Sequence, residues 1–121
     1  MSRCYNRNSV QRSCGMPVHQ SVLELVGKTP IVKAQKLDAG LCELYLKLEC
    51  MNPGGSIKDR IGVTMIEAAE KAGKIRPGAT LVEGTAGNTG IGLALAAQQK
   101  GYRLVLVVRD KMSREKIFNL K

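Results

Sequence analysis

Aromatic side chains are scarce in this chain, which has no Trp, one Phe and three Tyr among 121 residues. The scarcity matters because the net charge is +9, with 19 Lys and Arg against 10 Asp and Glu, and such a balance can indicate a nucleic-acid surface. Single strands stack their bases on aromatic rings, which this sequence has too few to supply. The basic residues are also scattered along the chain. We therefore expect no nucleic-acid partner and interpret the charge as a solvated basic surface suited to anionic ligands.

Long apolar runs and paired cysteines are missing as well. The longest apolar run, Ile91–Ala97, has seven residues, whereas a membrane-spanning helix needs ~20. No apolar signal core precedes Val22, and no two of the four cysteines have C-x-x-C spacing. The sequence therefore predicts a cytoplasmic protein with reduced thiols, no membrane partner and no metal site.

Acidic residues are absent from the first 23 positions, which carry Arg3, Arg7 and Arg12 together with several Ser and Asn. Three interpretations stay open: a disordered tail in which little can be buried, a mitochondrial transit peptide rich in Arg and Ser, or a non-native stretch before a true start at Met16. We expect residues 1–21 to be a disordered or non-native tail.

From Val22 onward, strands and helices are expected to alternate. Apolar runs and spacings predict strands at 44–48, 79–83 and 103–108, and helices at 58–72, at 89–100 and from Ser113 onward. This alternation predicts an α/β fold, built from βαβ units with a parallel sheet in three α/β/α layers. The chain ends inside the last predicted helix without a C-cap signal, so residues 22–121 are expected to be one domain truncated at its C-terminus.

The two complete predicted helices differ in their apolar surfaces. The first has one apolar face, whose members lie three and four residues apart: Ile61, Met65, Ala68, Ala69 and Ala72. Ser56 is its expected N-cap and Gly73 its C-cap. The second helix is apolar nearly all round and ends at Gly101, which predicts that it is buried.

The first chemically informative loop is Asn-Pro-Gly-Gly-Ser-Ile at 52–57, which leads into Lys58 at a predicted helix start. Its two glycines let the backbone approach a ligand closely. The partial positive charge of a helix N-terminus disfavours a charged lysine there and favours the neutral amine that forms a Schiff base. These residues alone leave a second interpretation open, namely an ordinary surface lysine beside Asp59 and Arg60.

The second loop, Glu-Gly-Thr-Ala-Gly-Asn-Thr-Gly at 83–90, joins a predicted strand to a predicted helix. Backbone N–H groups at such a helix start can hold an anion. The loop lacks the Gly-Lys-Ser/Thr ending of a Walker A motif, and its glycines do not follow G-x-G-x-x-G, so a nucleotide-binding module is the weaker alternative. Ligands of α/β sheets bind beyond the carboxyl ends of the strands, where both loops are expected.

Together these motifs resemble a known family. Lys47-Leu48-Glu49 followed by Asn-Pro-Gly-Gly-Ser-Ile-Lys-Asp-Arg is similar to the lysine signature of fold type II pyridoxal-phosphate (PLP) enzymes, and Thr-Ala-Gly-Asn-Thr-Gly is similar to their substrate loop. By this resemblance, which runs from about Leu25 to Lys121, the chain is identified as a member of the cysteine synthase/cystathionine β-synthase family. The segments 90–103 and 111–116 are most similar to the cystathionine β-synthase branch.

The resemblance implies a PLP-dependent lyase or transferase that performs β-replacement on serine or O-acetylserine. Homocysteine or sulfide would be the nucleophile, and cystathionine or cysteine the product. Lys58 would hold the cofactor and act in catalysis, and Asn88 would bind the cofactor. The implied substrate-binding residues are Thr85, Ala86, Gly87 and Thr89. Ala86 stands where the family usually has Ser, and Arg109 where it commonly has Pro.

Other parts of the family's site come later in its sequences, including the glycine-rich loop for the cofactor phosphate. The isolated chain is therefore expected to be inactive, and an inactive truncated remnant is the alternative to an enzyme. The full-length protein is expected to be a homodimer. Vertebrate members of the branch bind haem through an N-terminal Cys and His, but the spacing of Cys14 and His19 does not match, so no haem is predicted.

Overall fold

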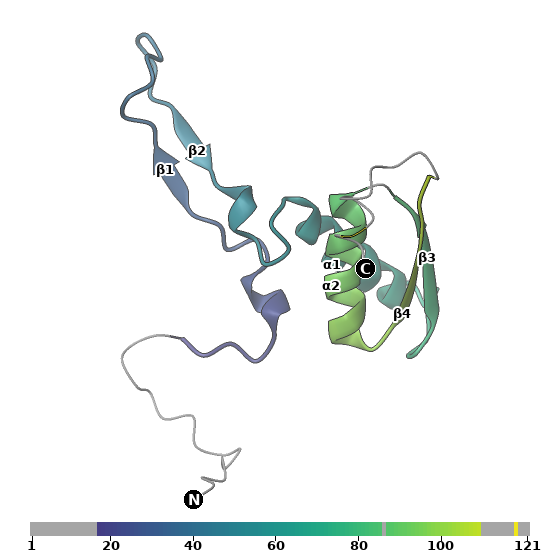
Figure 1. Cartoon of the computed structure of the whole chain (residues 1–121). Helices are drawn as coiled ribbons and strands as arrows, with labels where there is room; N and C mark the ends of the chain where they lie inside the picture. Colours follow the sequence, from purple (N-terminus) through teal and green to yellow (C-terminus); the bar gives the residue numbers. More distant parts are fainter. Residues whose placement is uncertain (1–16, 86, 110–117, 119–121) are drawn as a thin grey trace, which may run out of the picture.

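The computed structural model of the chain describes residues 17–85, 87–109 and 118, which form a protruding hairpin segment and a body of helices packed on a sheet (Figure 1). The described elements are η1 (Val22–Leu25), β1 (Ile31–Lys33), β2 (Tyr45–Lys47), η2 (Glu49–Met51), α1 (Lys58–Lys71), β3 (Thr80–Gly84), α2 (Asn88–Lys100) and β4 (Arg103–Val107). Most of the expected tail, and the helix expected from Ser113, lie outside the described residues.

β3, α2 and β4 form a βαβ unit, as the sequence predicted. β4 lies parallel to β3, with Leu81 opposite Leu104. Gly101 ends α2 in the left-handed conformation, at φ 75°, and the chain then turns directly into β4. Gly73 ends α1 in the same conformation, at φ 66°. Glycine adopts this conformation without the penalty that a Cβ brings, so both helix ends could be predicted from local sequence.

The strand expected at 44–48 forms as β2, but its predicted place in the parallel sheet is wrong. β2 pairs antiparallel with β1 in a separate two-stranded sheet, with Val32 opposite Leu46. β1 has three residues, too few to show a periodic pattern, so the sequence did not predict it. Antiparallel pairing lets residues 34–44 fold back without the crossover helix that parallel pairing requires. The described residues therefore contain one βαβ unit rather than two.

The apolar face predicted for α1 is also wrong. Ile61 and Met65 are 38% and 45% exposed, whereas the buried residues of α1 are Asp59, Gly62 and Ile66. These three also lie three and four positions apart, so periodicity alone does not decide between the two stripes. Gly62 determines which stripe is buried, because a residue without a side chain lets the backbone of α2 come into contact with the backbone of α1.

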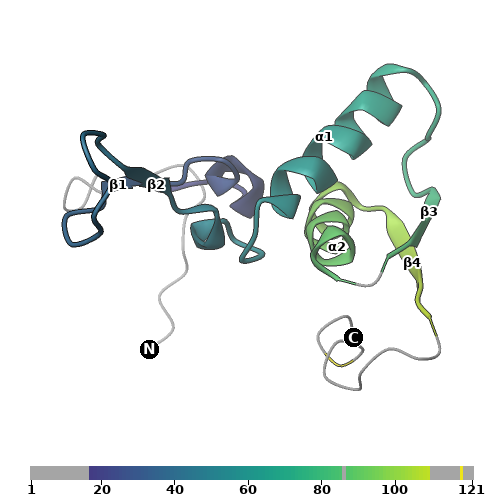
Figure 2. The ribbon, with the colours of Figure 1, turned by 90° about the horizontal axis from the view of Figure 1, so that it is seen from above.

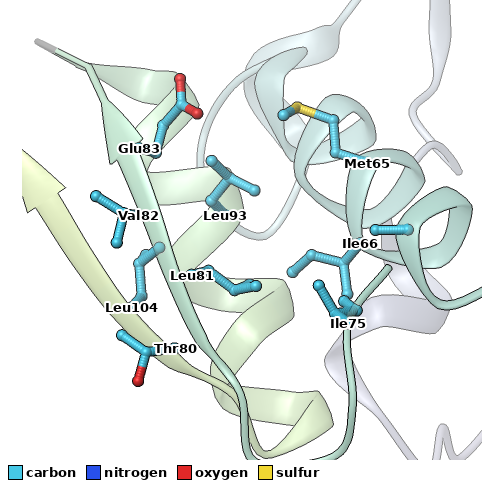
Figure 3. Close-up of a pocket in the computed structure, with 10 residues that line it drawn as sticks. Met65, Ile66, Ile75, Thr80, Leu81, Val82, Glu83, Leu93 and Leu104 are labelled. Carbon is cyan, nitrogen blue, oxygen red and sulfur yellow. The ribbon is translucent and has the colours of Figure 1, made fainter. Parts of the chain in front are cut away.

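The core lies between the two helices and the inner face of β3 and β4. Its buried apolar residues are Ile66 from α1 and Leu93, Ala96 and Ala97 from α2. Figure 3 shows Ile66, Ile75, Leu81 and Leu93 directed into the space between α1 and β3, an open pocket of about 270 Å³. Burial of α2 is therefore confirmed for the stripe that faces α1 and the sheet, while its opposite side is exposed at Ala94 and Gln98.

The outer face of the β3–β4 sheet is not covered by any described residue. Its side chains Val82, Val105 and Val107 are 67%, 49% and 58% exposed, since both described α-helices pack on the inner face (Figure 2). Within residues 17–85, 87–109 and 118, no helix is long and apolar enough to cross a membrane, and no cluster of His, Cys, Asp and Glu could hold a metal ion.

Candidate active site

Lys58 is the first residue of α1 and is partly exposed at the end of the loop 52–57. The loop turns tightly, because the amide of Gly55 donates to the carbonyl oxygen of Asn52 at 2.8 Å. Gly55 has a φ of 82°, a conformation that favours glycine. Ser56 lies one residue before the cap position, Ile57, and its hydroxyl accepts the amide of Lys58 at 3.1 Å. The predicted capping role of Ser56 is thus displaced by one residue but still acts on the first turn.

Asp59 fixes the middle of the same loop from inside the protein. Its side chain is fully buried, and its Oδ2 accepts the backbone N–H of Gly54 at 2.5 Å. A Cβ on Gly54 would lie within 3 Å of the Asp59 carboxylate, so glycine is required there by close approach. Sequence reasoning placed Asp59 beside a surface lysine. Nothing in the local pattern indicated that it would be buried.

The second loop leads from the carboxyl end of β3 into α2. The amide of Thr85 donates to the carbonyl oxygen of Val107 at 3.1 Å, which extends the ladder between β3 and β4. Gly87 is the cap residue of α2, and none of the described side chains caps this helix. Asn88 is exposed, while Thr85, Gly87 and Thr89 are partly buried. Ala86, the remaining predicted substrate residue, lies outside the described residues.

The first turn of α1 is in direct contact with the second turn of α2. A Cβ on Gly92 would lie 2.5 Å from the carbonyl oxygen of Lys58 and 3.0 Å from the Cα of Asp59. Gly62 meets the backbone of Gly92 in the same way from the α1 side. Figure 2 shows α2 nearly end-on, with α1 running across it. The structure therefore brings the helix start at Lys58 against α2, one turn after the second loop.

A polar cluster supports this arrangement on the side of the hairpin. The carboxylate of Glu49 binds the guanidinium of Arg60 through Nε at 2.8 Å and Nη2 at 2.9 Å. Hydrogen bonds from Arg60, and next from Thr29, lower the pKa of Glu49 to about 2. The sequence indicated no such role for Glu49. The two residues are eleven positions apart, with a turn and a short helix between them, and follow no helical or strand spacing.

This geometry offers three chemical functions on two helices that are in contact. Lys58 supplies a primary amine at a helix start. The loop before it contains two glycines, which have no side chains. The uncapped start of α2 supplies backbone N–H groups, and Thr85 and Thr89 supply hydroxyls. Both helix starts carry partial positive charge, which favours an anion between them. The site can therefore hold a ligand that combines an aldehyde with anionic groups.

Comparison with known proteins agrees with this chemistry. Residues 22–121 match the family described as "Pyridoxal-phosphate dependent enzyme". The chain belongs to this family. It is 56% identical over 99 residues to the cystathionine beta-synthase of Mus musculus, and 50% identical over 97 residues to the cysteine synthase of Staphylococcus aureus. These matches cover 79% of the chain in each case, but 18% of the mouse protein and 31% of the bacterial one.

The fold of this family member is also found in solved enzymes. The crystal structure of a hydrogen sulfide-producing enzyme from Fusobacterium nucleatum matches with a TM-score of 0.81 at 47% sequence identity, over 87% of this chain and 35% of that one. The α/β architecture is the N-terminal part of the fold type II PLP-enzyme fold, and the cofactor of the family is PLP. The residues fit this cofactor: Lys58 carries an amine for its aldehyde, its backbone contacts α2, and the start of α2 has no side-chain cap and can hold an anion.

Proposed function

We propose that the chain supplies the cofactor lysine and the substrate loop of a β-replacement enzyme. The reaction would convert serine or O-acetylserine, with homocysteine or sulfide, into cystathionine or cysteine, as a lyase or transferase of the cystathionine β-synthase or cysteine synthase type. The names of the two curated relatives support this reaction class. The structural observation that carries the proposal is the contact between the Lys58 carbonyl and Gly92, which joins the two helices that follow the two loops.

Each site residue has a proposed role. The Nζ of Lys58 would bond to the cofactor and, once the substrate has displaced it, would accept the α-proton of the substrate. PLP, when bound, supplies an electron sink for the charge left on the α-carbon. Asn88 would donate a hydrogen bond to the cofactor. The substrate carboxylate would lie against the start of α2, held by Thr85, Ala86, Gly87 and Thr89.

The isolated chain should have little activity of its own. It spans less than a third of the two curated relatives, and the described residues include no evident cradle for the cofactor phosphate. The exposed valines on the outer face of the sheet also favour association of the isolated chain. We propose that the complete enzyme is a cytoplasmic homodimer. An inactive remnant is the alternative, and it predicts no selective reaction of PLP at Lys58.

Two measurements test the proposal. The purified chain is incubated with PLP and reduced with borohydride, and the modified lysines are quantified by peptide mass spectrometry. Lys58 should be modified well above the exposed lysines 28, 36 and 74, whereas equal modification of all four would contradict the proposed role. In the second measurement, residues 22–121 replace the matching segment of the Staphylococcus aureus cysteine synthase, and the formation of cysteine and cystathionine by the chimera is assayed. A folded chimera that binds PLP but forms neither product would contradict the proposed reaction.

A further inference from the structure

The carboxylate of Glu49 accepts four side-chain hydrogen bonds, two at each oxygen. Its Oε1 accepts from Thr29 Oγ1 at 2.7 Å and from Arg60 Nη2 at 2.9 Å. Its Oε2 accepts from Arg60 Nε at 2.8 Å and from Asn52 Nδ2 at 2.9 Å. The bidentate pair with Arg60 is the stronger, directional form of a carboxylate–guanidinium contact. Glu49 is therefore held in one orientation by three partners.

Two of these partners, Asn52 and Arg60, lie on either side of the segment that carries Lys58. Asn52 opens the loop, and Arg60 follows Lys58 by two residues. Gly27 also connects Asn52 to Arg60, because its N–H donates to Asn52 Oδ1 at 2.8 Å and its carbonyl accepts from Arg60 Nη2 at 2.9 Å. Glu49 thus connects the entry of the loop to the first turn of α1 and shortens the free segment that carries Lys58.

The low solvent exposure of this cluster increases the contribution of these hydrogen bonds. Asn52 and Thr29 are 4% and 7% exposed, and the side chain of Glu49 is 18% exposed, so water competes little for the carboxylate. Its lowered pKa, about 2, keeps it ionised at neutral pH. A buried partner left without its hydrogen bond costs more than the bond itself contributes. Loss of the Glu49 charge should therefore release both ends of the loop.

α1 needs this support at its start. The cap position is occupied by Ile57, whose side chain accepts no hydrogen bond, so the one side-chain hydrogen bond described to the amide of Lys58 comes from the Ser56 hydroxyl. On one side the carbonyl of Lys58 rests against Gly92, which blocks movement toward α2. On the other side the first turn is held by the contact of Arg60 with Glu49, in addition to the hydrogen bond between Asp59 and Gly54.

We propose that Glu49 is a positioning residue for Lys58. It acts through Arg60 and Asn52, and sets the position of the lysine amine without contact with substrate or cofactor. The proposal rests on the proposed function for the role of Lys58. The position itself is a property of the chain and can be measured without PLP.

The first test measures the reaction of PLP with each lysine of the 121-residue chain, after borohydride reduction, in Glu49→Gln and Arg60→Lys. The control is Glu43→Gln, which removes an exposed partner of Lys33 on the hairpin. We expect modification of Lys58 to fall roughly tenfold in both test variants, with the other lysines and the circular dichroism unchanged. Arg60→Lys keeps the positive charge but not the bidentate geometry. A fall in Lys58 modification in this variant therefore separates positioning from a charge effect. Wild-type modification of Lys58 in both variants would overturn the proposal.

The second test uses amide hydrogen exchange of residues 54–60 without cofactor. Exchange should accelerate in Glu49→Gln relative to Glu43→Gln, whether or not Lys58 reacts with PLP, so failure of the proposed function is distinguishable from failure of this inference. If Glu49→Gln does not fold, Thr29→Val removes one of the four hydrogen bonds and should give a smaller acceleration in the same amides. Unchanged exchange in every folded variant would contradict a positioning role for Glu49.

Discussion

The backbone of Gly92 lies against the carbonyl oxygen of Lys58, at a distance that leaves no room for a Cβ. Lys58 opens α1 and Gly92 lies in the second turn of α2, so this contact determines the position of the proposed cofactor lysine relative to the proposed substrate loop. Gly62 completes the close approach from the other helix. Small residues at a helix crossing allow the two backbones to touch, as here, and the site depends on that crossing.

Gly92→Ala should destabilise the chain. The added methyl group would collide with backbone atoms of Lys58 and Asp59, which cannot move aside as a flexible side chain can. Overpacking of this kind costs about 1–3 kcal/mol. The free energy of unfolding from denaturant titration measures the effect. Gly84→Ala is the matched control, because a Cβ there meets nothing within 4 Å, and its effect should stay within ~0.5 kcal/mol. Equal stability of both variants would contradict the close helix contact.

Lys58→Ala should eliminate selective cofactor attachment. The amine proposed to bond to PLP is removed, while the backbone contacts of α1 remain. In the Staphylococcus aureus chimera, loss of the general base should reduce product formation by about 10²–10⁴-fold. Absorbance of the bound cofactor and product assays measure both effects. Lys74→Ala, which changes an exposed lysine after α1, should behave as wild type. Near-normal β-replacement by Lys58→Ala would exclude the assignment.

Asn88→Ala and Thr89→Ala should weaken ligand binding and leave the fold intact. Asn88 is exposed and Thr89 is partly buried at the start of α2, so neither substitution opens the core. Loss of one hydrogen bond to a charged ligand should reduce affinity roughly tenfold. The spectral change of the chimera on addition of serine or O-acetylserine gives the affinity. Gln98→Ala on the exposed side of α2 is the control. A wild-type response in both site variants would argue against the loop as substrate site.

Low pH should weaken the hydrogen bonds that the Glu49 carboxylate accepts, within a defined pH range. Hydrogen bonds from Arg60, and next from Thr29, lower its pKa from 4.5 to about 2 in the folded chain. A lowered folded-state pKa gives stability that is fully present above the unfolded-state value and is lost as pH falls toward the folded-state value. The thermal midpoint should therefore drop between about pH 5 and pH 2. The drop should be smaller in Glu49→Gln, which cannot titrate. An identical pH profile in the two proteins would contradict the lowered pKa.

Local sequence predicted much of the body because its signals are local. Gly73 and Gly101 end the two helices in the left-handed conformation, and α1, β3, α2 and β4 follow the expected order. The hairpin and the buried face of α1 were not predictable in this way. β1 is three residues long, and the buried stripe through Gly62 and Ile66 has the same spacing as the exposed stripe through Ile61 and Met65.

The sequence by itself determined the groups on which the proposed chemistry rests: an amine after a glycine loop at one helix start, and a loop of small and hydroxyl residues before the next helix. Those signals lie within short segments, since turns, caps and motif residues act on their neighbours. The tertiary structure alone decided that Gly92 meets Lys58 and that Glu49 binds Arg60 and Asn52. Contacts between distant segments depend on which surfaces pack together, and that packing follows from close backbone approach and from satisfying buried polar groups, which no local pattern encodes.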